Sequence, residues 1–354
     1  MTRIVVAGAG AIGASVAYHL AVGGARDVVL ADRGEVAGGA TAKAMGGVRQ
    51  QFSTAAEVRL AQESIRFFEE LGPPSFEQVG YLFLATTAEG LAQLEARRAL
   101  QRGLGVPVEH IAAADVAALA PGVRTDDVLG AVFCGRDGVA DPPAVTRELV
   151  RRAVELGVEV RERTPAEELN AHVLVIACGP HSAELAARVG VELPIRPLCR
   201  QLVETTPLDG LPQRLPMTVE AESGFHFRRR GDALVLAMPD ASPRWGFDEV
   251  VDESVLGDRL DRLAHRFPPA RRARVARAWA GLYDMTPDAH PIVGRIGEGV
   301  FAACGFSGHG FMQAPAVGLA LAEEILGGRS SLDLSAYRLE RLADAGHATE
   351  EVVL

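Results

Sequence analysis

The chain has 354 residues, of which 48% are hydrophobic and 23% are charged, and its formal net charge is -10 at pH 7. This length is more than one ordinary hydrophobic core supports, so two connected domains are expected. The acidic balance argues against a nucleic-acid-binding surface, which needs a basic stripe, and gives no reason to expect an anionic membrane as partner. One local basic run, Arg228-Arg229-Arg230, is interpreted as a solvated turn.

The cysteines and histidines show no spacing typical of a metal site or a disulfide framework. The four cysteines, at positions 134, 178, 199 and 304, form no C-x-x-C pair. The nine histidines include no H-x-x-x-H or H-E-x-x-H motif. We therefore expect no metal and a reducing, cytoplasmic environment.

The first expected element is a dinucleotide-binding strand-helix-strand unit. A buried strand at 4–7 leads into Gly8-Ala9-Gly10-Ala11-Ile12-Gly13, a helix follows through residue 20, and a second strand at 28–31 ends at Asp32. The three glycines allow a tight turn, close approach of a pyrophosphate and close packing of helix on strand. The helix N-terminus supplies amide donors, and the acid accepts hydrogen bonds from ribose hydroxyls. This unit does not distinguish FAD from NAD.

Two stretches without a formal charge, 4–25 and 300–322, are long enough to span a bilayer. Glycines interrupt the first, and polar and turn-forming residues interrupt the second. Each is interpreted as a strand, a tight turn and a helix, so no membrane span is expected.

The segment 38–52 is rich in small residues, which let a backbone pass close to a flat ring system, and Arg49 gives it a fixed positive charge. A flexible surface loop is the alternative interpretation. Thr54 and Glu57 then form a capping-box pattern, which predicts a helix through Leu71.

A second α/β region is expected in the middle of the chain, and the segments on either side of it have a different residue pattern. Asp141 and two prolines predict a helix that ends at Gly157, and strands are expected near 158–160 and at 173–177. Residues 78–135 and 195–290 instead mix short alternating strands with isolated helices. They are assigned to a second domain built on an antiparallel or mixed sheet.

The last motif is the glycine-rich loop 304–312, followed by a helix expected from about 314 to 326. Such a loop aims backbone amides and a positive helix end at one spot, which suits an anionic ring edge. His309 in this loop is by itself weak evidence, because isolated histidines are often structural.

Taken together, these motifs resemble the FAD-dependent amine and amino acid oxidoreductases, the D-amino acid oxidase and sarcosine oxidase-like superfamily. The resemblance rests on the glycine fingerprint and on three further stretches, 46–52 (GGVRQQF), 285–294 (MTPDAHPIVG) and 305–312 (GFSGHGFM). It is strongest to the beta subunits of heterotetrameric sarcosine oxidase and of dye-linked L-proline dehydrogenase. It implies an α/β fold with a Rossmann-like FAD-binding domain (1–77, 136–194 and 291–354) and an α+β substrate domain (78–135 and 195–290).

The resemblance also assigns residues to sites. Candidate catalytic or pocket residues are Arg49, His226, Tyr283 and His309. Candidate FAD-binding residues are Gly8, Ala9, Gly10, Ile12, Gly13, Asp32, Arg33, Thr41, Ala42, Gly46, Gly47, Val160, Cys178, Gly179, Ser307, Gly308, His309, Gly310, Phe311 and Met312.

Three departures from the family qualify these expectations. Gly281 stands where monomeric sarcosine oxidases carry a flavin-linking cysteine, which predicts noncovalent FAD. Val235 and Met312 stand near the positions of an oxygen-activating lysine and a carboxylate-binding lysine. The segment 160–173 is shorter than is usual in the family.

The expected reaction is oxidation of a small secondary amine or amino acid, such as sarcosine or L-proline, to an imine by hydride transfer to flavin N5. The expected electron acceptor is O2 or a partner protein, with a hetero-oligomer as one possible assembly. The alternatives are a glycine or D-amino acid oxidase or dehydrogenase, and a flavin-binding subunit with a structural or electron-relay role. An NAD-dependent dehydrogenase fits the fingerprint but leaves the 307–312 loop unexplained.

Overall fold

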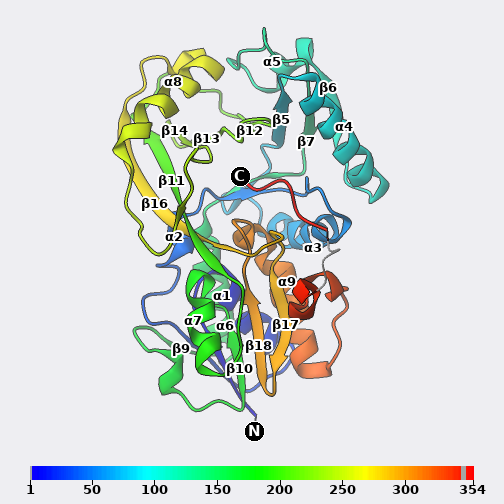
Figure 1. The fold of residues 1–354 in the computed structure, drawn as a ribbon, viewed down its shortest axis with the longest axis vertical. Coiled ribbons are helices and arrows are strands. Elements are labelled where there is room, and N and C mark those ends of the chain that lie inside the picture. The colour runs from blue at the N-terminus through cyan, green and yellow to red at the C-terminus, as the bar shows by residue number, and fades with distance from the viewer. Residues whose placement is uncertain (1, 344–347) are drawn as a thin grey trace.

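The structure, a computed structural model, describes residues 2–343 and 348–354 and contains three sheets (Figure 1). The six-stranded sheet has the order β17-β18-β10-β1-β2-β9 and is parallel except at β17. Its strands are β1 (Arg3–Ala7), β2 (Asp27–Ala31), β9 (Glu159–Arg161), β10 (Val173–Ile176), β17 (Ile292–Gly297) and β18 (Val300–Cys304).

The nine-stranded sheet is mixed, because β12 and β5 run parallel while the other neighbours are antiparallel. Its order is β15-β11-β14-β13-β12-β5-β7-β6, and β16 pairs with β11. The strands are β5 (Tyr81–Ala85), β6 (Glu109–Ala112), β7 (Gly130–Cys134), β11 (Arg196–Thr205), β12 (Met217–Glu220), β13 (His226–Arg230), β14 (Ala233–Ala237), β15 (Arg244–Trp245) and β16 (Val275–Met285).

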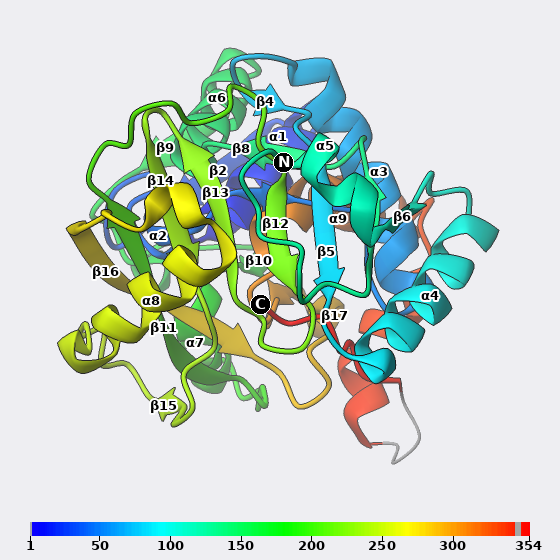
Figure 2. The ribbon, with the colours of Figure 1, turned by 90° about the horizontal axis from the view of Figure 1, so that it is seen from above.

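Helices cover both sheets, and a small three-stranded sheet connects β3 (Gly47–Val48), β8 (Gly138–Ala140) and β4 (Phe76–Glu77). From above, α8 and α4 lie to either side of the strands β13, β12 and β5 (Figure 2). The helices are α1 (Ala11–Val22), α2 (Ala40–Lys43), α3 (Ala55–Leu71), α4 (Ala88–Gly103), α5 (Val116–Leu119), α6 (Pro142–Glu155), α7 (Ser182–Arg188), α8 (Leu256–Arg266) and α9 (Gly310–Gly327).

The dinucleotide-binding unit forms where the sequence predicts it. The apolar run of β1 is buried, and α1 packs against α6 and α9 over the sheet. Burial of these apolar faces is the main force that holds the helices on the parallel strands. The Asp141 carboxylate caps α6 by accepting a hydrogen bond from the Ala144 amide at 2.8 Å. The predicted α/β fold with a second mixed sheet is confirmed.

Two local predictions were wrong in detail. The run Arg228-Arg229-Arg230 lies on strand β13, with Arg228 buried, and is not a solvated turn. Only half of the capping box at α3 forms: Thr54 Oγ1 accepts from the Glu57 amide at 3.4 Å, but the Glu57 carboxylate does not return to the Thr54 amide. That carboxylate is buried against His290 at 2.6 Å, because a tertiary partner outcompetes the local one.

The two larger sheets occupy different parts of the molecule, with the chain end near residue 354 lying between them (Figure 1). Strands of the six-stranded sheet come from 1–77, 136–194 and 291–354, and those of the nine-stranded sheet from 78–135 and 195–290. The domain boundaries themselves stay a prediction. Within residues 2–343 and 348–354, no helix combines the length and the apolar character needed to cross a membrane.

Candidate active site

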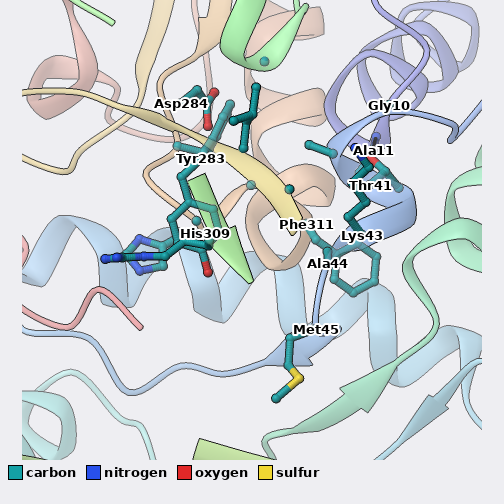
Figure 3. Close-up of a pocket in the computed structure, with 18 of the residues that line it drawn as sticks. Gly10, Ala11, Thr41, Lys43, Ala44, Met45, Tyr283, Asp284, His309 and Phe311 are labelled. Carbon is teal, nitrogen blue, oxygen red and sulfur yellow. Dashed lines mark hydrogen bonds between the residues drawn. The ribbon is translucent and has the colours of Figure 1, made fainter. Parts of the chain in front are cut away.

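A large cavity lies between the glycine-rich turn of α1 and the nine-stranded sheet, with an empty volume of about 1590 Å³ including its open mouth. Figure 3 shows Gly10, Ala11 and Thr41 in one part of it and Tyr283 and His309 in another. Predicted site residues that line it are Gly8, Gly10, Ile12, Asp32, Thr41, Gly46, Gly47, Arg49, Cys178, Gly179, His226, Tyr283, Gly308, His309, Gly310, Phe311 and Met312.

The remaining predicted residues do not line this cavity. The Ala9 amide bonds to Asp32, and Gly13 packs against the Gly8 carbonyl. Val160 packs in the core beside β2. Arg33 is exposed near Glu184, and the buried Ser307 hydroxyl meets the Thr286 amide at 3.2 Å. Ala42 lies on the short helix α2.

The glycine-rich turn has the geometry of a phosphate cradle. A Cβ atom added at Gly13 would lie 1.8 Å from the Gly8 carbonyl oxygen, so only glycine lets α1 approach β1 this closely. The first amides of a helix have no intrahelical partner, and Gly10 and Ile12 at this end of α1 line the cavity. The turn therefore fits a pyrophosphate group.

Asp32 and Thr41 fix this cradle from two sides. The Asp32 carboxylate accepts hydrogen bonds from the amides of Ala9 and Gly34, each at 2.7 Å. The Thr41 hydroxyl accepts from the Ala11 amide at 3.1 Å. Both side chains also line the cavity, so this carboxylate stays the candidate to accept hydrogen bonds from a ribose of a bound dinucleotide.

The loop before α9 brings Gly308 against the aromatic ring of Tyr283. Gly308 has a φ of +93°, and a Cβ atom there would lie 2.3 Å from Cε2 of that ring. Helix α9 begins at Gly310, several residues earlier than predicted, and its first turn lines the cavity. The positive end of a long helix is thus placed at the cavity wall.

Arg49 is buried and is held by backbone carbonyls. Its guanidinium donates to the carbonyl oxygens of Gln51 and Val352, the latter at 2.6 Å, and lies 4.0 Å over the centre of the Phe52 ring. His309 Nε2 lies 3.0 Å from the same Val352 oxygen and 3.2 Å from Arg49 Nη2, so the tautomer of this ring decides which of the two contacts is a hydrogen bond. Burial holds the pKa of His309 well below its ordinary value.

The segment 350–354 was missed by the sequence analysis, yet it contributes to the cavity wall beside Arg49 and Tyr283. The Glu350 carboxylate accepts hydrogen bonds from the amides of Ser53 and Thr54. Leu354 lines the cavity, and its carbonyl oxygen accepts from the Tyr283 hydroxyl at 2.8 Å. No local motif announces these contacts, because they join residues about 70 or 300 positions apart.

His226 on β13 presents a neutral ring to the cavity. Its Nδ1 lies 2.8 Å from the Gly224 carbonyl oxygen, so Nδ1 donates and Nε2 is left as an acceptor. Burial lowers the pKa of this ring to about 4. At neutral pH the side chain is therefore a hydrogen-bond acceptor and too weak a base to carry a proton.

The burial of His226 predicts a pH-dependent stability. Between pH 6.5 and about 4 the unfolded chain binds a proton that the folded chain does not, so folding stability falls as the pH falls through this window. We expect His226→Gln to cost about 2 kcal/mol less at pH 5 than at pH 7.5. Urea unfolding of both proteins at both pH values measures this difference. An equal cost at the two pH values would contradict a buried neutral ring.

Comparison with known proteins places the chain in a family. Residues 3–324 match the family model described as FAD dependent oxidoreductase. The solved L-proline dehydrogenase from P. horikoshii superposes with a TM-score of 0.90 at 27% identity, over 97% of this chain and 98% of that one. The sarcosine oxidase subunit beta of Arthrobacter sp is 25% identical over 98% of this chain and 92% of its own length.

Some relatives are much longer. The 4-methylaminobutanoate oxidase (formaldehyde-forming) of Paenarthrobacter nicotinovorans is 27% identical over 98% of this chain, which spans 46% of that relative's length. The predicted family resemblance and FAD as cofactor are confirmed, and the cradle at α1 has a shape that fits this dinucleotide. The chain belongs to the FAD dependent oxidoreductase family.

Proposed function

We propose that this protein oxidises the C–N bond of a small secondary amine or secondary amino acid to an imine, which water then hydrolyses. FAD, when bound, supplies the two-electron acceptor, with N5 receiving the hydride equivalent. The observation that carries the proposal is the single cavity that joins the dinucleotide cradle to a wall formed by His226, Tyr283 and Arg200.

The protein's part in this reaction is positioning and electrostatics. The neutral His226 ring accepts a hydrogen bond from the amine N–H through Nε2, which orients the nitrogen without trapping it as a cation. The Tyr283 ring, packed on Gly308, forms the side wall of the substrate space. The N-terminus of α9 stabilises negative charge that develops on the cofactor side of the cavity.

Three relatives support the substrate class. Their names refer to L-proline, sarcosine and 4-methylaminobutanoate. All three are secondary amines that carry a carboxylate. A substrate of this chemistry, held as the free amine, needs no dedicated side-chain base to lose a hydride from the carbon beside nitrogen.

The cofactor attachment and the electron acceptor are part of the proposal. A Cβ atom at Gly281 would lie 3.0 Å from Cβ of Lys43, so this position has little room for a flavin-linking side chain and we propose noncovalent FAD. Buried Val235 stands near the position at which the family resemblance implies an oxygen-activating lysine, and its apolar side chain favours a partner protein or soluble carrier over O2. A hetero-oligomer like that of sarcosine oxidase would supply such a partner.

Turnover with a panel of reductants tests the proposal. The FAD-loaded protein is assayed with sarcosine, L-proline, glycine and D-alanine, using first a dye and then O2 as acceptor. We expect sarcosine or L-proline to be oxidised fastest, with the dye preferred. Turnover of glycine or D-alanine alone would replace the proposal by the primary amino acid alternative. No turnover with any of the four would favour the role of a flavin-binding subunit.

A further inference from the structure

Arg200 on β11 lines the cavity and has no assigned role in the site described above. We infer that Arg200 binds the carboxylate of the substrate, so that the substrate is a secondary amino acid and not a simple secondary amine. This inference rests on the proposed function and adds the group that decides which amines are accepted.

The sheet places Arg200 beside the proposed reaction site. It pairs directly with Gly281 on the antiparallel strand β16, and the next pair on the same face is Leu198 with Tyr283. Gly281 contributes no side chain to this pair, and the side chain of Lys43 packs over its position. The central guanidinium carbon of Arg200 is 5.8 Å from the centre of the Tyr283 ring (for that ring, see Figure 3).

The guanidinium of Arg200 has donors to spare. Its Nε and Nη1 atoms are buried and have no hydrogen-bond partner within the described parts of the chain. A buried donor without a partner costs free energy, more so on a charged group. A carboxylate accepts two parallel N–H bonds from neighbouring nitrogens of a guanidinium, so a carboxylate held between Nη1 and Nη2 would satisfy the buried Nη1 atom.

The other cations on the cavity wall are already engaged. Lys43 forms an ion pair with Glu249. Arg49 donates through both terminal nitrogens to the carbonyls of Gln51 and Val352, which leaves only Nε without a partner and no fork for a carboxylate. Arg200 is therefore the cavity-lining cation best able to bind a carboxylate in bidentate fashion.

The position of Arg200 relative to His226 fits an amino acid. One row of neighbouring residues crosses β11, β14 and β13 and consists of Leu202, Ala237 and His226. Arg200 lies two residues before Leu202 on β11 and therefore on the same face of the sheet. A substrate with its carboxylate on Arg200 can thus direct its nitrogen toward the His226 ring. Two fixed points of contact define the orientation of the carbon between them.

Paired substrates with and without a carboxylate test this inference. The variants are Arg200→Met, Arg200→Lys, which keeps the charge but not the fork, and Arg196→Met as a control on the exposed part of the same strand. Their kcat/KM is measured for L-proline and for pyrrolidine, its analogue without the carboxylate. Isothermal titration of each FAD-loaded protein with pyrrole-2-carboxylate, an unreactive carboxylate, gives a readout that needs no turnover.

We expect Arg200→Met to lower kcat/KM for L-proline by about 10²- to 10³-fold, because the carboxylate loses its charged partner, while the value for pyrrolidine changes little. For L-proline, the kcat/KM of Arg200→Lys should lie between those of Arg200→Met and the unaltered protein. The kcat/KM of Arg196→Met should match that of the unaltered protein. Binding of pyrrole-2-carboxylate should weaken in the same order. If Arg200→Met does not fold, the same measurements on Arg200→Lys are compared with those on the control Arg196→Met.

The failures of the two proposals are distinguishable. Suppose that the unaltered protein oxidises L-proline and that Arg200→Met either keeps its kcat/KM for L-proline or loses kcat/KM equally for L-proline and pyrrolidine. This result would overturn the role of Arg200 and leave the proposed function intact. An unaltered protein that oxidises no amine but binds pyrrole-2-carboxylate through Arg200 would overturn the proposed function and leave a carboxylate site. If it does neither, both proposals fall.

Discussion

Replacing Gly308 with alanine is expected to lower the rate of substrate oxidation by about 100-fold, the size of effect that a displacement of about 1 Å at a reaction site produces. The new Cβ atom would lie 2.3 Å from Cε2 and 2.7 Å from Cζ of Tyr283. The backbone there has a φ of +93°, which costs a non-glycine residue about 1–3 kcal/mol.

The clash has no easy relief. The Tyr283 hydroxyl is held by the Leu354 carbonyl oxygen at 2.8 Å, so the ring is pinned at its far end. Either the ring leaves the substrate wall or the loop before α9 leaves the cofactor side. Gly327→Ala is the matched control, because a Cβ at the end of the same helix has no neighbour within 4 Å.

The measurement is the anaerobic rate of flavin reduction, with the FAD dissociation constant from fluorescence quenching. A Gly308→Ala protein that behaves like Gly327→Ala in both would show that Tyr283 and the loop are not part of the reaction site.

Replacing Glu57 with leucine is expected to lower the free energy of unfolding by about 3–5 kcal/mol, as for other broken buried pairs. The Glu57 carboxylate is fully buried and accepts hydrogen bonds from His290 Nδ1 at 2.6 Å and from the amide of Gln313. It thereby joins α3 to the loop before β17 and to α9. With leucine at this position, His290 and Gln313 would stay buried without their hydrogen-bond acceptor.

Glu63→Leu on the same helix is the control, since Glu63 forms a surface ion pair with Arg66 and such pairs contribute about 1 kcal/mol or less. Urea unfolding of the two variants and the unaltered protein gives the comparison. Equal losses in the two variants would mean that the buried network contributes nothing beyond an ordinary surface pair.

The first 32 residues show what sequence reasoning predicts well. The turn from Gly8 to Gly13 and the acid Asp32 act through contacts between neighbouring elements, so their spacing alone predicts the strand, the cradle and the helix. The structure adds the physical reason, the close approach of Gly13 to the Gly8 carbonyl.

The substrate side was less accessible to such reasoning. Arg200 became a candidate only when β11 was paired with β16, because no feature of its local sequence separates it from other arginines. Arg49 is in the predicted loop, but Val352, some 300 residues away, takes up one of its donors. Glu57 likewise fulfils a helix-start pattern while its carboxylate serves a distant histidine. In each case a long-range partner decides the role of the side chain.

The most direct test is a single anaerobic turnover. The purified protein is loaded with FAD, freed of oxygen and mixed with excess L-proline or sarcosine while the flavin absorbance is recorded and the imine product is trapped chemically. Bleaching of the flavin together with one equivalent of trapped product, and full release of the flavin on acid precipitation, is the expected result. A protein that binds FAD but stays oxidised with every secondary amine, or one that binds no FAD at all, would contradict the proposed amine oxidation.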